Sequence, residues 1–245
     1  MRRMLCLSVA FGFVACVAGI ASAQNLLTDP GMNAVGPNGQ LGNTPNPPWV
    51  VTAARGASLA FDDGAASEGF ANVAADVGGT HGLFFKAFVG NPPWDPTAGN
   101  VDATISQSVP GTAGLKYVLT GWWGAEDNYS GLTTPGANTI FALDFLNAAG
   151  GLIGSAELDL EAAGLGDPSN PGLNYEQFMV SAIAPAGTQI VRSRGSMIDG
   201  VFFQDPGQAL VTDLWKLTAV PEPATVTMAG LGLAGLVALR RRSQR

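Results

Sequence analysis

Short runs of β-forming residues, separated by clusters of glycine, proline, asparagine and aspartate, fill the chain between residues 24 and 219. No long helical periodicity occurs in this region, and its best helical candidate is one short stretch, 156–163. Because short runs between turn signals are typical of strands, the pattern predicts an all-β domain. We expect strands at 57–61, 82–89, 101–109, 115–123, 139–146, 152–158, 176–183, 189–193 and 209–218.

Several of these strands alternate between apolar and polar residues. In TIFALDFLN, Phe141, Leu143 and Phe145 point one way and Asp144 points the other. Strict alternation in ALVTDLWKLT places Val211, Asp213, Trp215 and Leu217 on one face, with Lys216 opposite. Faces of this kind predict antiparallel sheets packed as a β-sandwich. The loops at 29–48, 90–100, 124–137 and 164–175 are rich in proline, glycine and asparagine, and long loops on a rigid sandwich are where binding is usual.

The N-terminal sequence has the three parts of a secretory signal peptide. Arg2 and Arg3 precede a mostly apolar run at 5–20, and Ala21-Ser22-Ala23 has the small residues of a cleavage site. We therefore predict a signal peptide at 1–23, cleaved after Ala23. An uncleaved membrane anchor and a lipidated Cys16 are the alternatives. Both cysteines of the chain lie in this segment, so the mature protein has no disulfide and no cysteine metal site.

The region that follows is strongly acidic. Residues 24–219 contain 18 of the 19 acidic side chains and six of the 12 basic ones, a formal net charge of −12. A surface with this charge repels nucleic acids and anionic membranes. We therefore expect no nucleic acid partner.

The C-terminal sequence AVPEPATVTMAGLGLAGLVALRRRSQR, residues 219–245, ends in an apolar run and a basic cluster. Residues 224–239 carry no charge and, with Ala219 and Val220 ahead of them, approach the length of about 20 residues that spans a bilayer. Arg240, Arg241 and Arg242 would hold the end of this span in the cytoplasm. A plain tail anchor accounts for these parts but not for Pro221-Glu222-Pro223, which forces an extended segment at the membrane surface.

Val220, Pro221, Glu222, Pro223, the apolar span and Arg240–Arg242 occur in the order and spacing of a known signal. Residues 220–245 resemble the PEP-CTERM sorting signal, which implies processing by exosortase, a membrane-embedded enzyme resembling cysteine transpeptidases. The resemblance implies export through the inner membrane and transient anchoring there by a single transmembrane sorting helix. The final location would be the cell envelope or the extracellular matrix.

A looser resemblance covers the body, residues 24–219. NLLTDPGMNAVG resembles the opening strand and turn of galactose-binding-like carbohydrate-binding modules, and ALVTDLWKLTAV resembles their closing strand. Segments between them, such as ISQSVPGTAGLKYVLTGWW, follow in the order that this family shows. The resemblance implies one jelly-roll domain.

Residues with catalytic or metal-binding chemistry are few. His81 is the sole histidine, no G-x-S-x-G motif occurs, and nothing singles out a catalytic pair of carboxylates. We therefore expect a protein that is not an enzyme. Related jelly rolls hold a structural calcium between the first turn and the last strand, which implies Asn33 and Asp213 as ligands. An acidic residue commonly stands where Asn33 does, and backbone hydrogen bonds could instead satisfy Asp213.

Sugar binding relies on flat aromatic faces. Trp49 and Trp94 lie in proline-rich loops, each in an N-P-P-W string, and Tyr129 lies in a polar loop. Trp122 and Trp123 point to opposite faces if they lie on a strand, so one belongs to the core and the other could meet a ligand. We take Trp49, Trp94, Trp122 and Tyr129 as candidate ligand-binding residues, with packing in the core as the alternative for each.

The leading hypothesis is a non-catalytic protein associated with extracellular polysaccharide. The alternative is a structural or adhesive matrix protein that binds no glycan.

Overall fold

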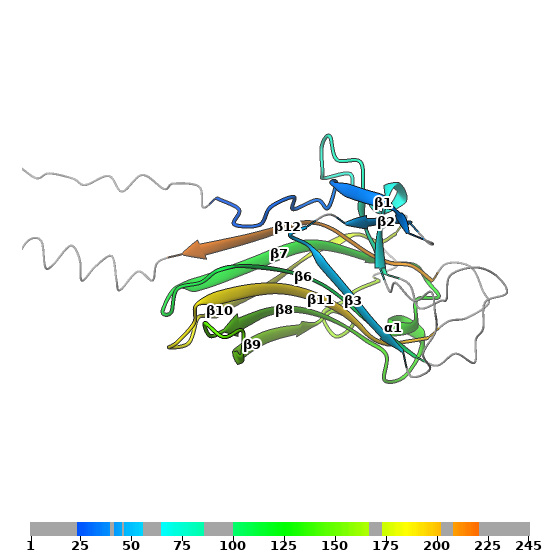
Figure 1. Ribbon diagram of the computed structural model, residues 1–245. Helices are drawn as coiled ribbons and strands as arrows, with labels where there is room; N and C mark the ends of the chain where they lie inside the picture. The colour runs from blue at the N-terminus through cyan, green and yellow to red at the C-terminus, as the bar shows by residue number, and fades with distance from the viewer. Residues whose placement is uncertain are drawn as a thin grey trace, which may run out of the picture.

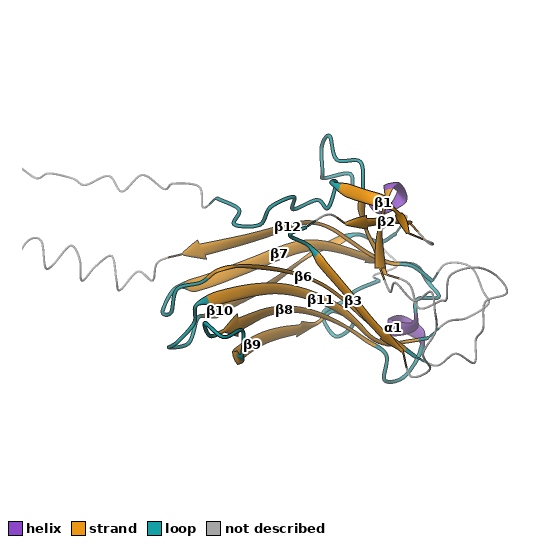
Figure 2. Ribbon diagram, in the orientation of Figure 1, coloured by secondary structure: helices purple, strands orange, loops and turns teal. Residues whose placement is uncertain are grey.

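The computed structural model describes residues 24–39, 42–45, 47–55, 65–85, 100–166, 173–201 and 208–220, and nearly all of its regular structure is β (Figures 1 and 2). These residues form twelve strands, one α-helix of four residues, α1 (Ser130–Thr133), and one 3-10 helix, Gly69–Ala71. The predicted all-β class is confirmed.

The strands form two antiparallel sheets. The seven-stranded sheet has the order β1-β2-β4-β5-β12-β7-β10, and the five-stranded sheet has the order β3-β6-β11-β8-β9. The first contains β1 (Val35–Gly39), β2 (Gly42–Pro45), β4 (Ala65–Glu68), β5 (Gly82–Phe85), β7 (Lys116–Ala125), β10 (Glu176–Ile183) and β12 (Leu210–Val220). The second contains β3 (Val50–Arg55), β6 (Val101–Pro110), β8 (Asn138–Leu146), β9 (Leu152–Asp159) and β11 (Ile190–Gly200).

Strands with clear alternation match the sequence prediction closely, and β10 begins and ends at the expected residues. The expected strand at 57–61 lies outside the described residues. β1, β2, β3 and β4 were not predicted. The sequences VGPNG, GNTP and AASE of β1, β2 and β4 consist mostly of residues that are poor in strands. β3, VVTAAR, was missed although its first three residues favour strands, and the expected strand at 189–193 covers only the start of β11.

The helical candidate at 156–163 was wrong. Its first four residues end β9, where Asp159 pairs with Ile140 of β8, and turns follow from Leu160. The amide of Leu160 donates to the carbonyl of Thr139 at 2.9 Å, and that of Ala162 donates to the Asp159 carboxylate at 2.9 Å. Pairing with a neighbouring strand thus prevails over a weak local helical preference.

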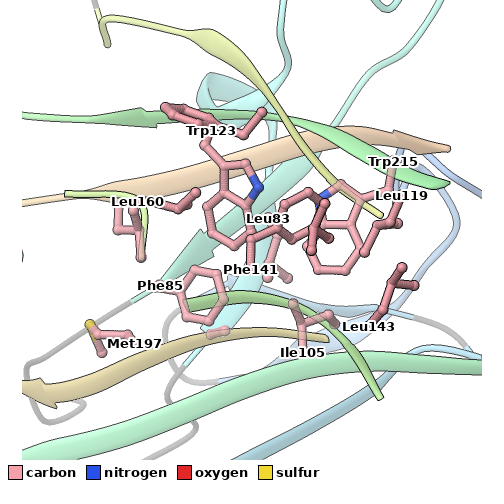
Figure 3. Close-up of a cluster of buried hydrophobic side chains, with 14 of the residues drawn as sticks. Leu83, Phe85, Ile105, Leu119, Trp123, Phe141, Leu143, Leu160, Met197 and Trp215 are labelled. Carbon is pink, nitrogen blue, oxygen red and sulfur yellow. The ribbon is translucent and has the colours of Figure 1, made fainter. Parts of the chain in front are cut away.

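The core lies between the two sheets and is centred on aromatic rings (Figure 3). Trp123 of β7, Trp215 of β12 and Phe141 of β8 are fully buried, with ring centroids 4.9–5.6 Å apart. Gly195 of β11 makes room for this group, because a Cβ there would lie 2.5 Å from Cη2 of Trp123. Edge-to-face and tilted ring contacts add to the burial of apolar area.

A β-bulge in β12 changes the predicted face of Asp213. The register shifts between Asp213 and Lys216, and Leu214 adopts a φ of 50°. Asp213 therefore pairs with Trp122 on the outer face, whereas Trp215 and Leu217 join the core. Strict alternation was wrong here, because a bulge inserts one extra residue and reverses the sides that follow.

Both sequence ends lie outside the described residues, namely the expected signal peptide at 1–23 and the segment at 221–245. Within the described part of the chain, no helix is long and apolar enough to cross a membrane.

Candidate functional site

Trp49 packs inside the protein. Its side chain is 3% exposed, its ring meets that of Trp215 edge-to-face with centroids 5.4 Å apart, and its Nε1 donates to the carbonyl of Asp29 at 2.7 Å. The indole thus closes the core beneath the N-terminal segment. This is the packing role that the sequence left open for Trp49, and it offers no free ring face to a sugar.

Tyr129 is also a core residue. It is 1% exposed, and its hydroxyl shares a hydrogen bond of 2.8 Å with Oγ1 of Thr139, which in turn donates to Glu161. Burial raises the pKa of Tyr129 far above its usual value. The three side chains hold the loop at 126–129 against the start of β8.

Among the candidate aromatic residues that the structure describes, Trp122 is the one that solvent partly reaches. It lies half-buried on the outer face of the seven-stranded sheet, while Trp123 points into the core, as the alternation of a strand requires. Trp94, the remaining candidate, lies outside the described residues.

Sequence reasoning missed an aromatic pair that joins the 3-10 helix to the seven-stranded sheet. Phe70, on the 3-10 helix Gly69–Ala71, is 53% exposed and meets Phe84 of β5 edge-to-face at 5.1 Å between ring centroids. Its position between glycine and alanine is the signal that could have drawn attention to it.

Asn33 and Asp213 lie near each other, beside Asp76 and Gly31. The Asn33 side chain donates from Nδ2 to Oδ2 of Asp76 at 2.9 Å. Its Oδ1 accepts from the amides of Thr80 and His81. Because two backbone N–H groups donate to Oδ1, the orientation of the Asn33 side-chain amide is fixed. Its Nδ2 hydrogens therefore face the carboxylate of Asp76.

Asp213 is fully buried, and its carboxylate accepts hydrogen bonds from the amides of Val73 at 2.8 Å and Leu214 at 2.6 Å. Burial raises the pKa of Asp213 to about 7, the two hydrogen bonds oppose this rise, and the charges of Asp76 and Asp29 add to it. The carboxylate thus joins the closing strand to the loop at 73–76.

This arrangement does not fit Asn33 as a calcium ligand. Calcium binds oxygen, whereas Asn33 uses its oxygen for backbone amides and presents its amide hydrogens to the acidic side. Among the described residues, no three histidine, cysteine or carboxylate side chains gather as a metal site.

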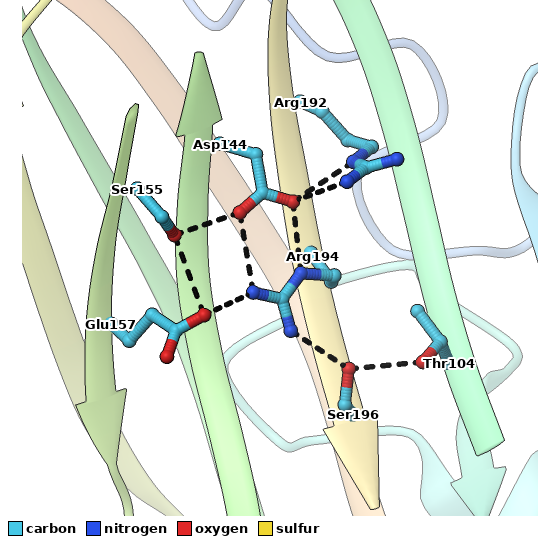
Figure 4. Close-up of polar contacts among 7 residues, drawn as sticks. All are labelled: Thr104, Asp144, Ser155, Glu157, Arg192, Arg194 and Ser196. Atoms are coloured by element: carbon cyan, nitrogen blue, oxygen red, sulfur yellow. Dashed lines mark hydrogen bonds and ion pairs between the residues drawn. The ribbon is translucent and has the colours of Figure 1, made fainter. Parts of the chain in front are cut away.

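An extended polar network lies on the outer face of the five-stranded sheet, and sequence reasoning did not find it (Figure 4). Asp144 of β8 is 1% exposed and accepts hydrogen bonds from two arginines of β11. Arg192 contacts its Oδ2 through Nε at 2.9 Å and Nη2 at 2.7 Å. Arg194 contacts Oδ2 through Nε at 2.9 Å and also reaches Glu157 of β9.

The electrostatics of this network favour a charged Asp144. Burial alone would raise the pKa of its carboxyl, but hydrogen bonds and the charge of Arg194, with further bonds from Arg192 and Ser155, lower it. The aspartate thereby fixes the planes of both guanidinium groups, so they lie preorganised on the sheet.

Hydroxyl groups surround the two arginines. Ser108 and Ser106 of β6 pair in register with Arg192 and Arg194, and they alternate with buried residues, so both hydroxyls lie on the outer face. Arg194 donates to Ser196, which shares a hydrogen bond of 3.0 Å with Thr104. We call this surface of Thr104, Ser106, Ser108, Asp144, Ser155, Glu157, Arg192, Arg194 and Ser196 the guanidinium face.

Comparison with known proteins identifies the C-terminal sequence: residues 219–242 match the PEP-CTERM protein-sorting motif. The chain carries a PEP-CTERM sorting motif. The motif begins within β12, where Val220 ends the strand, and its proline and arginine residues lie outside the described part of the chain. A PEP-CTERM motif implies an exported protein with a C-terminal signal for exosortase.

No curated protein matches the chain. Among solved structures, the enzymatically active domain of tailspike protein 4 from bacteriophage CBA120 is similar at a TM-score of 0.52 and 10% identity. That match covers 80% of this chain and 21% of the tailspike chain, so the present chain spans about a fifth of the tailspike's length. At this identity the likeness shows the fold alone.

Two other solved structures are similar at lower TM-scores. A family 61 carbohydrate-binding module in complex with β-1,4-galactotriose gives 0.46 at 14% identity, over 81% of this chain and all of the module. A Stig cyclase from Fischerella sp. TAU gives 0.48 at 15% identity, over 82% and 99% of the two chains.

These comparisons correct one prediction. The expectation that the protein is not an enzyme was wrong, because an enzymatically active tailspike domain shares the fold. The fold class therefore gives no ground for excluding catalysis.

Proposed function

We propose that this chain is an exported protein of the cell envelope or extracellular matrix, that exosortase processes its C terminus, and that its body associates with extracellular polysaccharide. The observation that carries the proposal is the PEP-CTERM motif at 219–242. The signal peptide at 1–23, the apolar span at 224–239 and the cytoplasmic arginines complete the proposed topology.

The proposed body is a jelly roll. Its eight consecutive strands β5 to β12 divide into the orders β5-β12-β7-β10 and β6-β11-β8-β9, which supports this assignment. The chain crosses from one of these four-stranded layers to the other after every strand from β5 to β11 except β8, which agrees with a double-sheet jelly roll of two Greek keys.

We place the polysaccharide contact on the guanidinium face. A guanidinium group has five N–H donors, and Arg192 uses two of its nitrogens, Nε and Nη2, to bind Asp144. Within the described residues nothing accepts a hydrogen bond from Nη1 of Arg192, and the hydroxyls of Ser106 and Ser108 lie beside it on the same face. Donors that are already held in place lose little entropy when a sugar hydroxyl replaces water.

Trp122 forms the rival site. It lies on the outer face of the seven-stranded sheet, on the opposite side of the core from Arg192. One sugar ring therefore does not contact both residues, and substitution at each position separates the two sites.

The test measures retention of the detergent-purified full chain on a panel of insoluble polysaccharides and on the native matrix. Arg192→Gln should weaken retention about tenfold or more, because a hydrogen bond to a charged group contributes about 1.5–3 kcal/mol. Trp122→Ala should leave retention unchanged, and Lys216→Gln is the control for loss of a positive charge elsewhere.

Loss of retention in Trp122→Ala but not in Arg192→Gln would move the site to the other sheet. A folded wild-type chain that no polysaccharide retains would contradict glycan binding. Sedimentation would then test the structural alternative through self-association or protein partners.

A further inference from the structure

The chain leaves the body at one end of the sandwich, beside three hairpin turns (Figure 1). Val220, the last residue of β12, pairs with Lys116 of β7, which pairs with Ile183 of β10. The amide of Gly114 donates to the carbonyl of Ala184 at 2.8 Å, and that of Gln189 donates to the carbonyl of Leu146 at 2.9 Å. These bonds place the turns after β6, β8 and β10 next to one another.

This end has an unusual charge. The segments that form it are 24–28, 108–118, 145–153, 181–191 and 216–220, and we call them together the acid-free end. They contain no aspartate or glutamate, although residues 24–219 contain 18. Their ionisable side chains, apart from the buried Tyr117, are Lys116 and Lys216, both of which are exposed.

The acid-free end is also apolar. Leu26, Leu152, Ile153, Ile183 and Val220 belong to it and are 38–58% exposed. They make up five of the nine large hydrophobic residues that are exposed in the described part of the chain. Apolar side chains beside lysines are the composition of surfaces that lie in a membrane interface.

The sequence after Val220 places this end near a membrane. Only Pro221, Glu222 and Pro223 separate Val220 from the apolar run that begins at Ala224. A fully extended chain spans at most about 3.6 Å per residue, so these four steps reach no further than about 14 Å. If 224–239 lies in the bilayer, the end of β12 lies within about 14 Å of the point where this run enters it.

We propose that the acid-free end rests on an anionic lipid surface while the sorting segment is inserted. This inference rests on the proposed function, because it requires residues 224–239 to enter the membrane. The net charge of −12 repels anionic lipids from other surfaces, so the carboxylate-free end with two lysines is the end that can approach. Docking would fix the direction in which Pro221-Glu222-Pro223 leaves the body.

The test uses the full chain with Cys6→Ser and Cys16→Ser, reconstituted in vesicles of phosphatidylcholine and phosphatidylglycerol. A bimane fluorophore is attached at Ala113→Cys, on the exposed turn of the acid-free end, or at Ala162→Cys. Ala162 is the matched control, since it is an exposed turn alanine beyond the far end of β9, an eight-residue strand about 26 Å long. A nitroxide on the lipid headgroups quenches a fluorophore that approaches the surface.

We expect the label at position 113 to lose emission and the label at 162 to keep it. Lys116→Gln with Lys216→Gln should reduce the ratio of docked to undocked protein about thirtyfold, because each lysine near an anionic surface contributes about 1 kcal/mol and 1.4 kcal/mol corresponds to tenfold. The loss of emission at 113 should then decrease.

Equal quenching at both positions, or none at either in chains that sediment with the vesicles, would overturn the docking proposal alone. Quenching at 113 that the lysine substitutions leave unchanged would overturn its electrostatic basis. A chain that does not sediment with vesicles would contradict membrane insertion, and the docking proposal would fall with it.

Discussion

Raising the pH from about 4 to about 7 should destabilise the fold through Asp213. Burial, opposed by hydrogen bonds from Val73 and Leu214, raises the pKa of this carboxyl from 3.8 to about 7, with repulsion from Asp76 and Asp29 adding to the rise. The folded state therefore binds the proton more tightly than the unfolded state. The resulting stabilisation is complete below pH 3.8 and is lost as the pH rises through about 7. A difference of about three pKa units corresponds to roughly 4 kcal/mol.

Asp213→Asn separates this charge effect from the hydrogen bonds. The asparagine cannot ionise, but its NH₂ group would face one of the two backbone amides that now donate to the carboxylate. At low pH the variant should thus be less stable than wild type by about 1–3 kcal/mol, the cost of an unsatisfied buried group. Above pH 7 the wild type has lost its advantage, and the order should reverse.

The assay is urea unfolding followed by tryptophan fluorescence at several pH values between 4 and 8. Asp127→Asn, on an exposed turn, is the matched control and should follow the wild-type profile. The decisive quantity is the difference in unfolding free energy between wild type and Asp213→Asn. A difference that stays constant across this pH range would refute the reasoning.

Two further substitutions test the sheets. Asp144→Asn should lower the free energy of unfolding at neutral pH by about 1–3 kcal/mol, because Arg192 loses its charged partner and Arg194 keeps only Glu157. Since the pKa of Asp144 is lowered, the wild-type advantage should persist at neutral pH and decline as the pH falls below 3.8; an advantage that grows in acid would contradict this. Gly195→Ala should destabilise by about 1–3 kcal/mol in the same urea assay, because its Cβ would meet Trp123, whereas Gly69→Ala meets no atom closer than 3.5 Å and should have a smaller effect. Equal effects of the two alanines would argue against a tightly packed core at Gly195.

Local patterns predicted the fold class and most long strands. The alternation of Phe141, Leu143 and Phe145 gave both the strand β8 and its buried face. The bulge at Leu214 could not be predicted from the local sequence pattern. Its positive φ arises where β12 meets the N-terminal segment, and the Trp215 amide there donates to the carbonyl of Pro30. One inserted residue was enough to move Asp213 to the other face.

The candidate site depended on contacts that local patterns do not contain. Trp49 looked exposed because prolines precede it, but its ring covers Trp215, more than 160 positions away. Asp144 and Arg194 are 50 residues apart, and only the pairing of β8 with β11 brings them together. Without the strand register, the sequence shows separate charges and no guanidinium face.

The intact mass of the protein recovered from the cell envelope or medium tests the central claim, exosortase processing at the PEP-CTERM motif, most directly. The account predicts a mass that lacks the C-terminal arginines Arg240, Arg241 and Arg242, and a full-length mass when Pro221, Glu222 and Pro223 are replaced by alanine. A wild-type protein whose mass ends at Arg245 would contradict it.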